Sequence, residues 1–289
     1  MLDMIASQVA NGVALGFIYV VIAIGLSVVL GLLGIVNFAH GAFFALGGYF
    51  ALTLYQHFGW PAVALAPLGA AAVGMVLEVA LIRRIYGADP LRGLIMTFAI
   101  AMFLEAAISL TWGTLSYSLP TPEFLAGFSE FGPIFITNYR AAVVLAVIAL
   151  LAALWAFLTF TPYGRILRAG GRDPEMVGLL GINLPRVWTA AFGLGAGLAG
   201  VAGVLAAPIW TVMPGISQAA IMPAFVVVAI GGLGSYAGAI IAGLAVGIVT
   251  SLCVQFWPEA SGAAMYVLML LTLLLRPRGL FGIKWERFE

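Results

Sequence analysis

Few polar side chains stand inside the apolar stretches of this sequence, and Glu105, in the stretch 93–112, is the clearest candidate for chemistry. Thr97 precedes it by eight residues and Ser109 follows it by four, so the three side chains lie on roughly one stripe of a helix. An ionisable group at the centre of a membrane helix costs about 2.5–3.5 kcal/mol on insertion scales, which favours a functional role. The stripe indicates either a polar solute path or hydrogen bonds that only lock helices together.

Two further polar pairs flank apolar stretches. Asn37 and His40 stand three residues apart, on one helical face, and on physical grounds an interfacial histidine and a helix N-cap are the leading interpretation. Ser217 and Gln218 stand at the start of a later apolar stretch. A proton-coupled carrier generally shows a richer relay of acids, histidines and arginines, so this sparse set counts against ion-driven transport.

The sequence contains no motif for nucleotide or metal chemistry. GxxxxGK[ST] is absent and Lys284 is the one lysine, so no nucleotide-binding loop of that kind can be built. Cys253 is the one cysteine, and HExxH and CxxC are absent. We therefore expect no enzyme site and no cofactor bound by this chain. An active pump built from it needs energy from another subunit or from an ion gradient.

The elements that position these residues are predicted to be membrane helices. Of the 289 residues, 64% are hydrophobic and 8% are charged, whereas a soluble domain has about 25% charged residues. Lipid is the solvent that tolerates this composition. The formal net charge of +1 gives no basic field for nucleic acid. We predict an all-α, polytopic transmembrane helical bundle that forms a single membrane domain over residues 1–289.

Nine apolar segments are candidates for the roughly 20 residues that a spanning helix needs. They lie at 9–33, 38–57, 61–82, 93–112, 140–160, 188–208, 220–233, 237–256 and 261–275. The seventh is short and runs into the breaker GGLGS at 231–235, which fits either a tight hairpin or a broken helix. We therefore expect eight or nine spans.

The positions of the basic residues predict the orientation. Eleven of them lie in three loops: Arg83, Arg84 and Arg92; Arg165, Arg168, Arg172 and Arg186; and Arg276, Arg278, Lys284 and Arg287. All three loops can face the cytoplasm if 220–233 and 237–256 cross the membrane separately, and the N-terminus and the loop 113–139 then lie outside. That loop holds Glu123 and Glu130 and no basic residue, which suits an external face.

The cytoplasmic loop 161–187 has a helix-forming pattern of its own. Asp173 suits the N-cap of a helix, Pro174 its first position and Glu175 its first turn. Gly181 suits the C′ position that ends it. Three apolar residues share one face by their spacing: Met176, Leu179 and Leu180. A helix of about seven residues is not stable alone in water. It must dock on the bilayer, on the chain's own helices, or in a groove on a cytoplasmic partner.

Four sequence motifs together resemble the permease subunits of branched-chain amino acid ABC importers, the LivH-type proteins. They are GIVNFAHGAF at 34–43, GRILRA at 164–169 with DPEMVGLLGI at 173–182, GGLGS at 231–235, and RPRGLFG at 276–282. The similarity runs from about residue 10 to 282. Relatives of this family carry urea or short amides, and more distant ones carry pentoses.

The resemblance implies partners that the composition does not show. They are a second homologous permease subunit, two cytoplasmic ATPase subunits that use ATP and Mg²⁺, and an external (periplasmic) substrate-binding protein, assembled in the lipid of a bacterial inner membrane. The helix 174–180 then becomes a coupling helix on an ATPase, with Arg165 and Arg168 in the same loop. Glu123 and Glu130 then lie on the face that receives the binding protein.

The resemblance also implies leucine, isoleucine or valine as the solute, carried by alternating access. Our hypothesis for the translocation path is Asn37, His40, Thr97, Glu105, Ser217 and Gln218. A polar path of this kind does not exclude urea. The rival interpretations are a stand-alone secondary transporter or channel, and a membrane scaffold that transports nothing.

Overall fold

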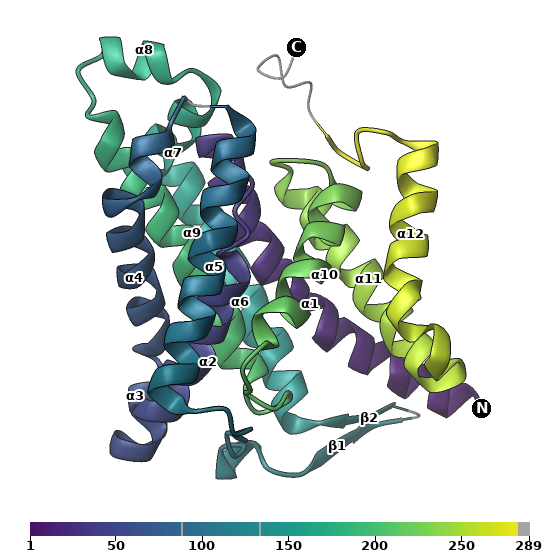
Figure 1. Cartoon of the computed structure of the whole chain (residues 1–289). Helices are drawn as coiled ribbons and strands as arrows, with labels where there is room; N and C mark the ends of the chain where they lie inside the picture. Colours follow the sequence, from purple (N-terminus) through teal and green to yellow (C-terminus); the bar gives the residue numbers. More distant parts are fainter. Residues whose placement is uncertain (88, 133, 283–289) are drawn as a thin grey trace. The chain divides into compact units, whose positions relative to one another are not determined.

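The computed structural model describes residues 1–87, 89–132 and 134–282, and every predicted apolar segment is helical (Figure 1). In chain order the nine segments are α1 (Leu2–Leu33), α2 (His40–Phe58), α3 (Trp60–Val63) with α4 (Ala66–Ala80), α5 (Pro90–Trp112), α6 (Asn138–Phe160), α9 (Leu184–Ala206), α10 (Ile216–Gly231), α11 (Tyr236–Phe256) and α12 (Ser261–Leu275). The prediction of an all-α polytopic bundle is confirmed.

Within the described ranges, seven helices are long and apolar enough to cross a membrane by length and composition. The two that fall short are α2 and α10. Helix α10 has 16 residues, and α2 carries His40 and His57 among its 19 residues. The first half of α2 is buried by the rest of the chain.

Short elements fill the loops. They are η1 (Ile82–Ile85), η2 (Glu123–Leu125), β1 (Phe128–Phe131), β2 (Ile134–Thr137), α7 (Pro162–Arg172), α8 (Pro174–Leu179) and η3 (Pro258–Ala260). Strand β1 pairs antiparallel with β2, with Phe128 opposite Thr137. This hairpin lies in the loop 113–139 and was not predicted.

The chain divides into two compact units that interleave along the sequence. Unit 1 comprises residues 1–27, 120–147 and 222–289, and unit 2 comprises residues 28–119 and 148–221. Helices α1, α6 and α10 continue from one unit into the other.

Small residues allow close helix packing in unit 2, where α9 lies against α2 and α4. A Cβ at Gly200 would lie 2.8 Å from the Cβ of Ala70 on α4, so the two helices approach closely only because that position is glycine. The rings of Phe43 on α2 and Phe192 on α9 meet edge to face, with their centroids 5.8 Å apart. Both rings are buried, and they form part of the core of this unit.

In unit 1, glycine residues likewise allow α1 and α11 to pack closely. A Cβ at Gly16 would lie 2.8 Å from the carbonyl oxygen of Gly243. Between α10 and α11, Gly232 and Gly234 have positive φ angles of 93° and 75°, and the Ser235 hydroxyl caps α11 by accepting from the amide of Gly238. The breaker at 231–235 is therefore a tight turn between two helices, which decides between the two alternatives that the sequence left open.

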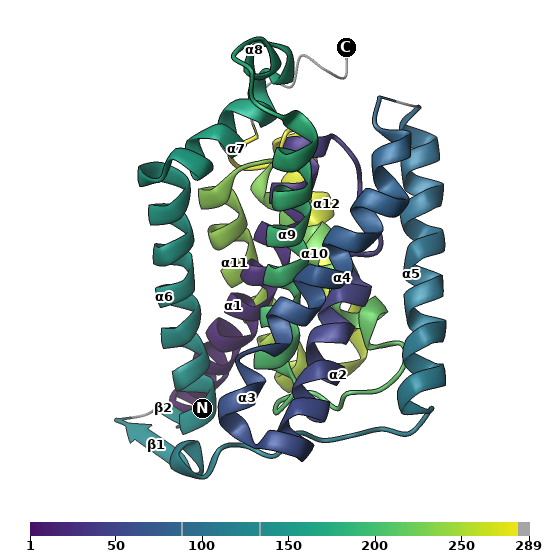
Figure 2. The same ribbon diagram turned by 90° about the vertical axis from the view of Figure 1, so that its left-hand side faces the viewer.

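The ends of each unit agree with the predicted orientation. In unit 2, α7, α8 and the connection from α4 to α5 lie at one end and α3 lies at the other (Figure 2), so two of the basic loops share an end. In unit 1, the Phe135 amide of the hairpin donates to the Ser7 hydroxyl near the N-terminus at 3.0 Å. The C-terminal end of α12, where Arg276 and Arg278 follow, is the opposite end of that unit (Figure 1). Lys284 and Arg287 lie outside the described residues.

Candidate functional site

The segment 34–39 leads into α2 from the interior of unit 2 rather than from its end. The Phe38 amide donates to the Thr97 hydroxyl at 3.2 Å, and that hydroxyl donates to the Val36 carbonyl at 3.0 Å. Thr97 is the eighth residue of α5, so α2 begins about 10 Å along α5 at 1.5 Å per residue. The buried Thr97 thus fixes the depth at which α2 starts.

Asn37 and His40 are buried, with exposed fractions of 1% and 0%. The Asn37 side-chain oxygen accepts from the Ala39 amide at 3.1 Å, while the N-cap position itself is Ala39. The Asn37 amide nitrogen has no hydrogen-bond acceptor among the described residues. The interpretation of an interfacial histidine and an asparagine N-cap is therefore wrong, because the chain buries both residues and the helix starts later.

Glu105 and Ser217 meet, as the hypothesis of a shared path requires. The Ser217 hydroxyl donates to Glu105 Oε1 at 3.2 Å. Ser217 is buried at the start of α10, but Gln218 is exposed, because successive helical residues point about 100° apart. Ser109 donates to the backbone carbonyl of Glu105 in its own helix, so it adds no side-chain partner to the carboxylate.

The first turns of α2 and α10 touch at Gly41. A Cβ at this position would collide with the Ser217 carbonyl oxygen and would lie 2.9 Å from the Ile221 Cβ. Contacts and sequence spacing therefore link Asn37, His40, Ser217 and Glu105 around the beginnings of two helices. Thr97 lies beside the segment that leads into this group, which we call the helix-start cluster (Asn37, His40, Gly41, Glu105 and Ser217).

Helix α8 has the predicted ends. Asp173 Oδ1 accepts from the Met176 amide at 2.9 Å, Pro174 is the first helical residue, and Gly181 has a φ of 78°. These are the features of an N-capped helix that a glycine terminates.

The predicted apolar face of α8 is not covered by the chain. Met176, Leu179 and Leu180 are 53%, 83% and 72% exposed, whereas Val177, on another face, is buried. The chain's own helices thus do not cover the face, which leaves the bilayer surface or a partner.

Helix α7, which precedes α8, was missed. Its N-cap is Thr161, whose hydroxyl accepts from the Gly164 amide at 3.0 Å, and Pro162 is its first residue. The threonine–proline pair was the available signal. Leu167 packs with Val187 and Ala191 of α9, and three arginines of α7 are exposed: Arg165, Arg168 and Arg172.

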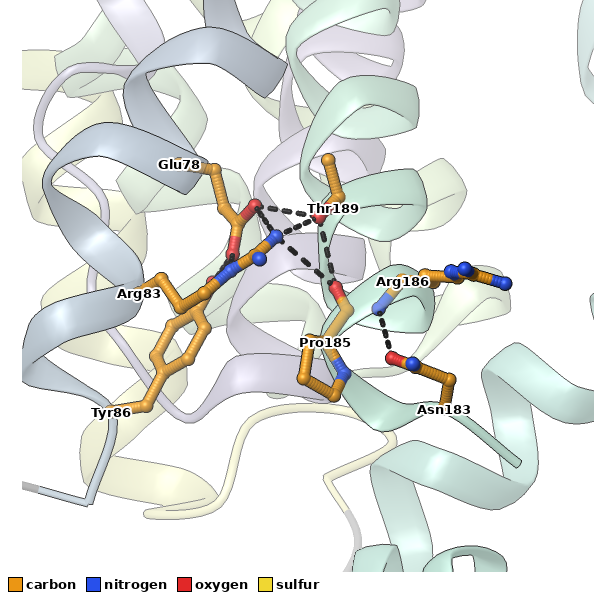
Figure 3. Close-up of polar contacts among 7 residues, drawn as sticks. All are labelled: Glu78, Arg83, Tyr86, Asn183, Pro185, Arg186 and Thr189. Atoms are coloured by element: carbon orange, nitrogen blue, oxygen red, sulfur yellow. Dashed lines mark hydrogen bonds and ion pairs between the residues drawn. The ribbon is translucent and has the colours of Figure 1, made fainter. Parts of the chain in front are cut away.

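An ion pair between the buried Glu78 at the end of α4 and the partly exposed Arg83 of η1 makes hydrogen bonds to the first turns of α9, as Figure 3 shows. Arg83 Nη2 lies 3.0 Å from Oε2 of Glu78, which is completely buried, and Arg83 Nε donates to Oε1 at 3.2 Å. The Tyr86 hydroxyl donates to Oε1 at 3.0 Å and the Thr189 hydroxyl donates to Oε2 at 2.7 Å. Glu78 and Arg83 are five residues apart, so this part of the arrangement is local. No sequence pattern pointed to Thr189, which lies on another helix.

The ion pair raises the pKa values of two groups in it and beside it. Its hydrogen bond to Glu78 raises the pKa of Arg83, and burial together with the Glu78 charge raises the pKa of Tyr86. Arg83 therefore stays charged and Tyr86 stays a neutral donor at physiological pH.

Comparisons with known proteins point to one family. A family profile described as "Branched-chain amino acid transport system / permease component" matches residues 8–273. The chain is 34% identical to the "High-affinity branched-chain amino acid transport system permease protein LivH" of Escherichia coli K12, covering 95% of this chain and 94% of LivH. It is 32% identical to the "High-affinity branched-chain amino acid transport system permease protein BraD" of Pseudomonas aeruginosa, covering 95% of this chain and 95% of BraD.

A second permease protein of the same named system is also similar. LivM of Escherichia coli K12 is 27% identical over 96% of this chain and 71% of LivM. The family profile spans nearly all of the described helices, and the identity to LivH extends over the same region. The chain therefore belongs to the family of branched-chain amino acid transport permeases.

Proposed function

We propose that this chain is the permease subunit of an ABC importer that carries branched-chain amino acids across a bacterial inner membrane. Membership of the permease family supports the transport class. The names of the relatives LivH and BraD support the solute class. The chain contributes the path, and the energy comes from ATP and Mg²⁺ bound by separate ATPase subunits.

The observation that carries the proposal is the uncovered apolar face of α8. Met176 and Leu179 of this six-residue helix and Leu180 directly after it are exposed together, and an apolar patch of this kind favours a partner that covers it. The position of α8 beside the basic α7, at the end of unit 2 that the arginines mark as cytoplasmic, favours a cytoplasmic protein as that partner. We infer that α8 is the coupling helix and that an ATPase subunit receives Met176, Leu179 and Leu180. The coupling surface extends to Asp173, Pro174, Glu175, Arg165 and Arg168.

Two further partners follow from the same proposal. LivH and LivM carry the name of one transport system, which supports pairing of this chain with a homologous second permease subunit. An external binding protein delivers the solute to the face that carries the hairpin and the acidic residues Glu123 and Glu130.

In the proposed mechanism, ATP binding closes the ATPase pair and moves α8. The motion passes to α9 through the short connection 180–183 and the α7–α9 contact at Leu167. Rocking of the helices then opens the path inward. The solute passes the helix-start cluster and Thr97, and the exposed Gln218 lies along the same route.

Two measurements test the assembly and the solute. A tagged chain co-expressed with its neighbouring transport genes should retain the second permease and both ATPase subunits through size-exclusion chromatography. The co-expressed external protein should bind leucine, isoleucine or valine in a calorimetric titration and should not bind urea. Loss of the ATPase subunits from the complex would refute the importer assignment, and preferential binding of urea would refute the solute assignment.

A further inference from the structure

The carboxylate of Glu105 is not balanced by a cation. Its side chain lies in the apolar helix α5, and the hydroxyl of Ser217 is its hydrogen-bond donor. Over the ranges that the structure describes, the one salt bridge joins Glu78 and Arg83, so Glu105 has no basic partner there. A charged carboxylate inside a membrane span is unfavourable unless a cation or several donors meet it. The Glu105 carboxylate is therefore suited to bind a cationic group of a solute transiently.

The same cluster presents unused donors. The Asn37 side-chain nitrogen carries two N–H groups, is buried, and has no acceptor within the described part of the chain. It stands three residues before the first residue of α2, where the helix dipole concentrates positive partial charge. A buried amide with unused donors beside a helix N-terminus is a suitable environment for an anion.

A chain of contacts within unit 2 connects these two halves. Asn37 and His40 are three residues apart, Gly41 touches the Ser217 backbone, and the Ser217 side chain bonds Glu105. One side of the cluster therefore accepts a cation and the other donates to an anion. A small molecule that carries a cationic group and an anionic group a short distance apart matches this arrangement.

We propose that the helix-start cluster binds the zwitterionic head of an α-amino acid. Glu105 accepts hydrogen bonds from the ammonium group, while the Asn37 amide donates to the carboxylate, which the dipole of α2 also favours. The site rests on the proposed transport function and adds the recognition chemistry to it. Urea and short amides have no cation for Glu105, so the site selects against them.

The experiment uses the whole complex without the external protein, so that binding to the permease alone is measured. A leucine analogue that carries a photoreactive diazirine is crosslinked to the complex, and labelled peptides are mapped by mass spectrometry. We expect labels in the peptides that contain residues 37–41, 105 and 217. Leucine should compete, whereas 3-methylbutylamine, which lacks the carboxylate, and 4-methylpentanoate, which lacks the ammonium group, should not.

Variants connect the labelling to the two charges. Glu105→Gln and Asn37→Leu should each lower labelling by about tenfold or more, because each removes a hydrogen bond to a charged group. Glu105→Asp should keep part of the signal. Glu259→Gln, which changes an exposed acid on η3, should keep all of it. Each variant must also retain its partner subunits on size-exclusion chromatography.

The outcomes separate this site from the wider function. If the wild-type complex is labelled elsewhere, or if Glu105→Gln is labelled like wild type while the complex stays intact, the site is wrong although the importer assignment stands. Competition by either one-charge analogue as strong as that by leucine also overturns it. If the wild-type complex with its external protein shows no ATP-dependent uptake, the proposed function itself fails.

Discussion

Replacing Thr189 by valine removes the hydroxyl with which α9 contacts the ion pair of the buried Glu78 and the partly exposed Arg83. Valine keeps the branched shape at Cβ, so the change removes the hydroxyl that donates to Glu78 and accepts from Arg83. The Thr189 hydroxyl has a single proton. The charged Glu78 carboxylate, at 2.7 Å, attracts it more strongly than the neutral Pro185 carbonyl at 2.9 Å.

The size of the effect follows from the burial of Glu78. A hydrogen bond to a charged group contributes about 1.5–3 kcal/mol to stability, whereas one between neutral groups contributes about 1 kcal/mol. Because the Glu78 side chain is fully buried, bulk water does not reach the carboxylate to replace the lost hydrogen-bond donor. We therefore expect Thr189→Val to lower the free energy of unfolding by about 1.5–3 kcal/mol. Tyr86→Phe, which removes the donor to the other carboxylate oxygen, should act in the same direction.

Equilibrium unfolding of the purified chain in mixed detergent micelles, followed by circular dichroism, measures these differences. Thr111→Val is the matched control, because that exposed hydroxyl bonds only carbonyls of its own helix, and we expect less than about 0.5 kcal/mol. The double variant of Thr189 and Tyr86 should deviate from additivity, since both hydroxyls serve one carboxylate. If Thr189→Val is no more destabilising than Thr111→Val, the reasoning about this ion pair is refuted.

Two other predictions concern packing and coupling. Met176→Asp together with Leu180→Asp should abolish retention of the ATPase subunits on affinity purification while membrane insertion stays normal; unchanged retention would refute the coupling-helix assignment. Gly16→Ala should destabilise the chain by about 1–3 kcal/mol in the same micelle assay, because its Cβ would lie 2.8 Å from the Gly243 carbonyl. Gly262→Ala, where nothing lies within 4 Å, serves as control, and equal effects at the two sites would contradict the packing argument.

Local features of the fold were predictable from the sequence because they depend on neighbouring residues. The spans follow from apolar length, and the ends of α8 follow from Asp173, Pro174 and Gly181, whose conformational preferences act within one turn. The signal for α7 at Thr161 and Pro162 was equally local and could have been used.

What the sequence could not show depends on contacts between distant residues. Thr189 meets Glu78 across 111 positions, and no spacing rule connects them. The depth at which α2 begins is set by the bond from Phe38 to Thr97, which a hydropathy pattern does not contain. Within the candidate site, the contact of Ser217 with Glu105 agrees with the proposed path. Its neighbour Gln218 is exposed.

The central claim is that this chain provides a path and that ATP hydrolysis by other subunits drives transport through it. Uptake of radiolabelled leucine into vesicles tests this most directly. We predict accumulation only when the second permease, the ATPase subunits, internal ATP and the external binding protein are all present. Accumulation of leucine by vesicles that contain this chain alone, without ATP, would contradict the claim.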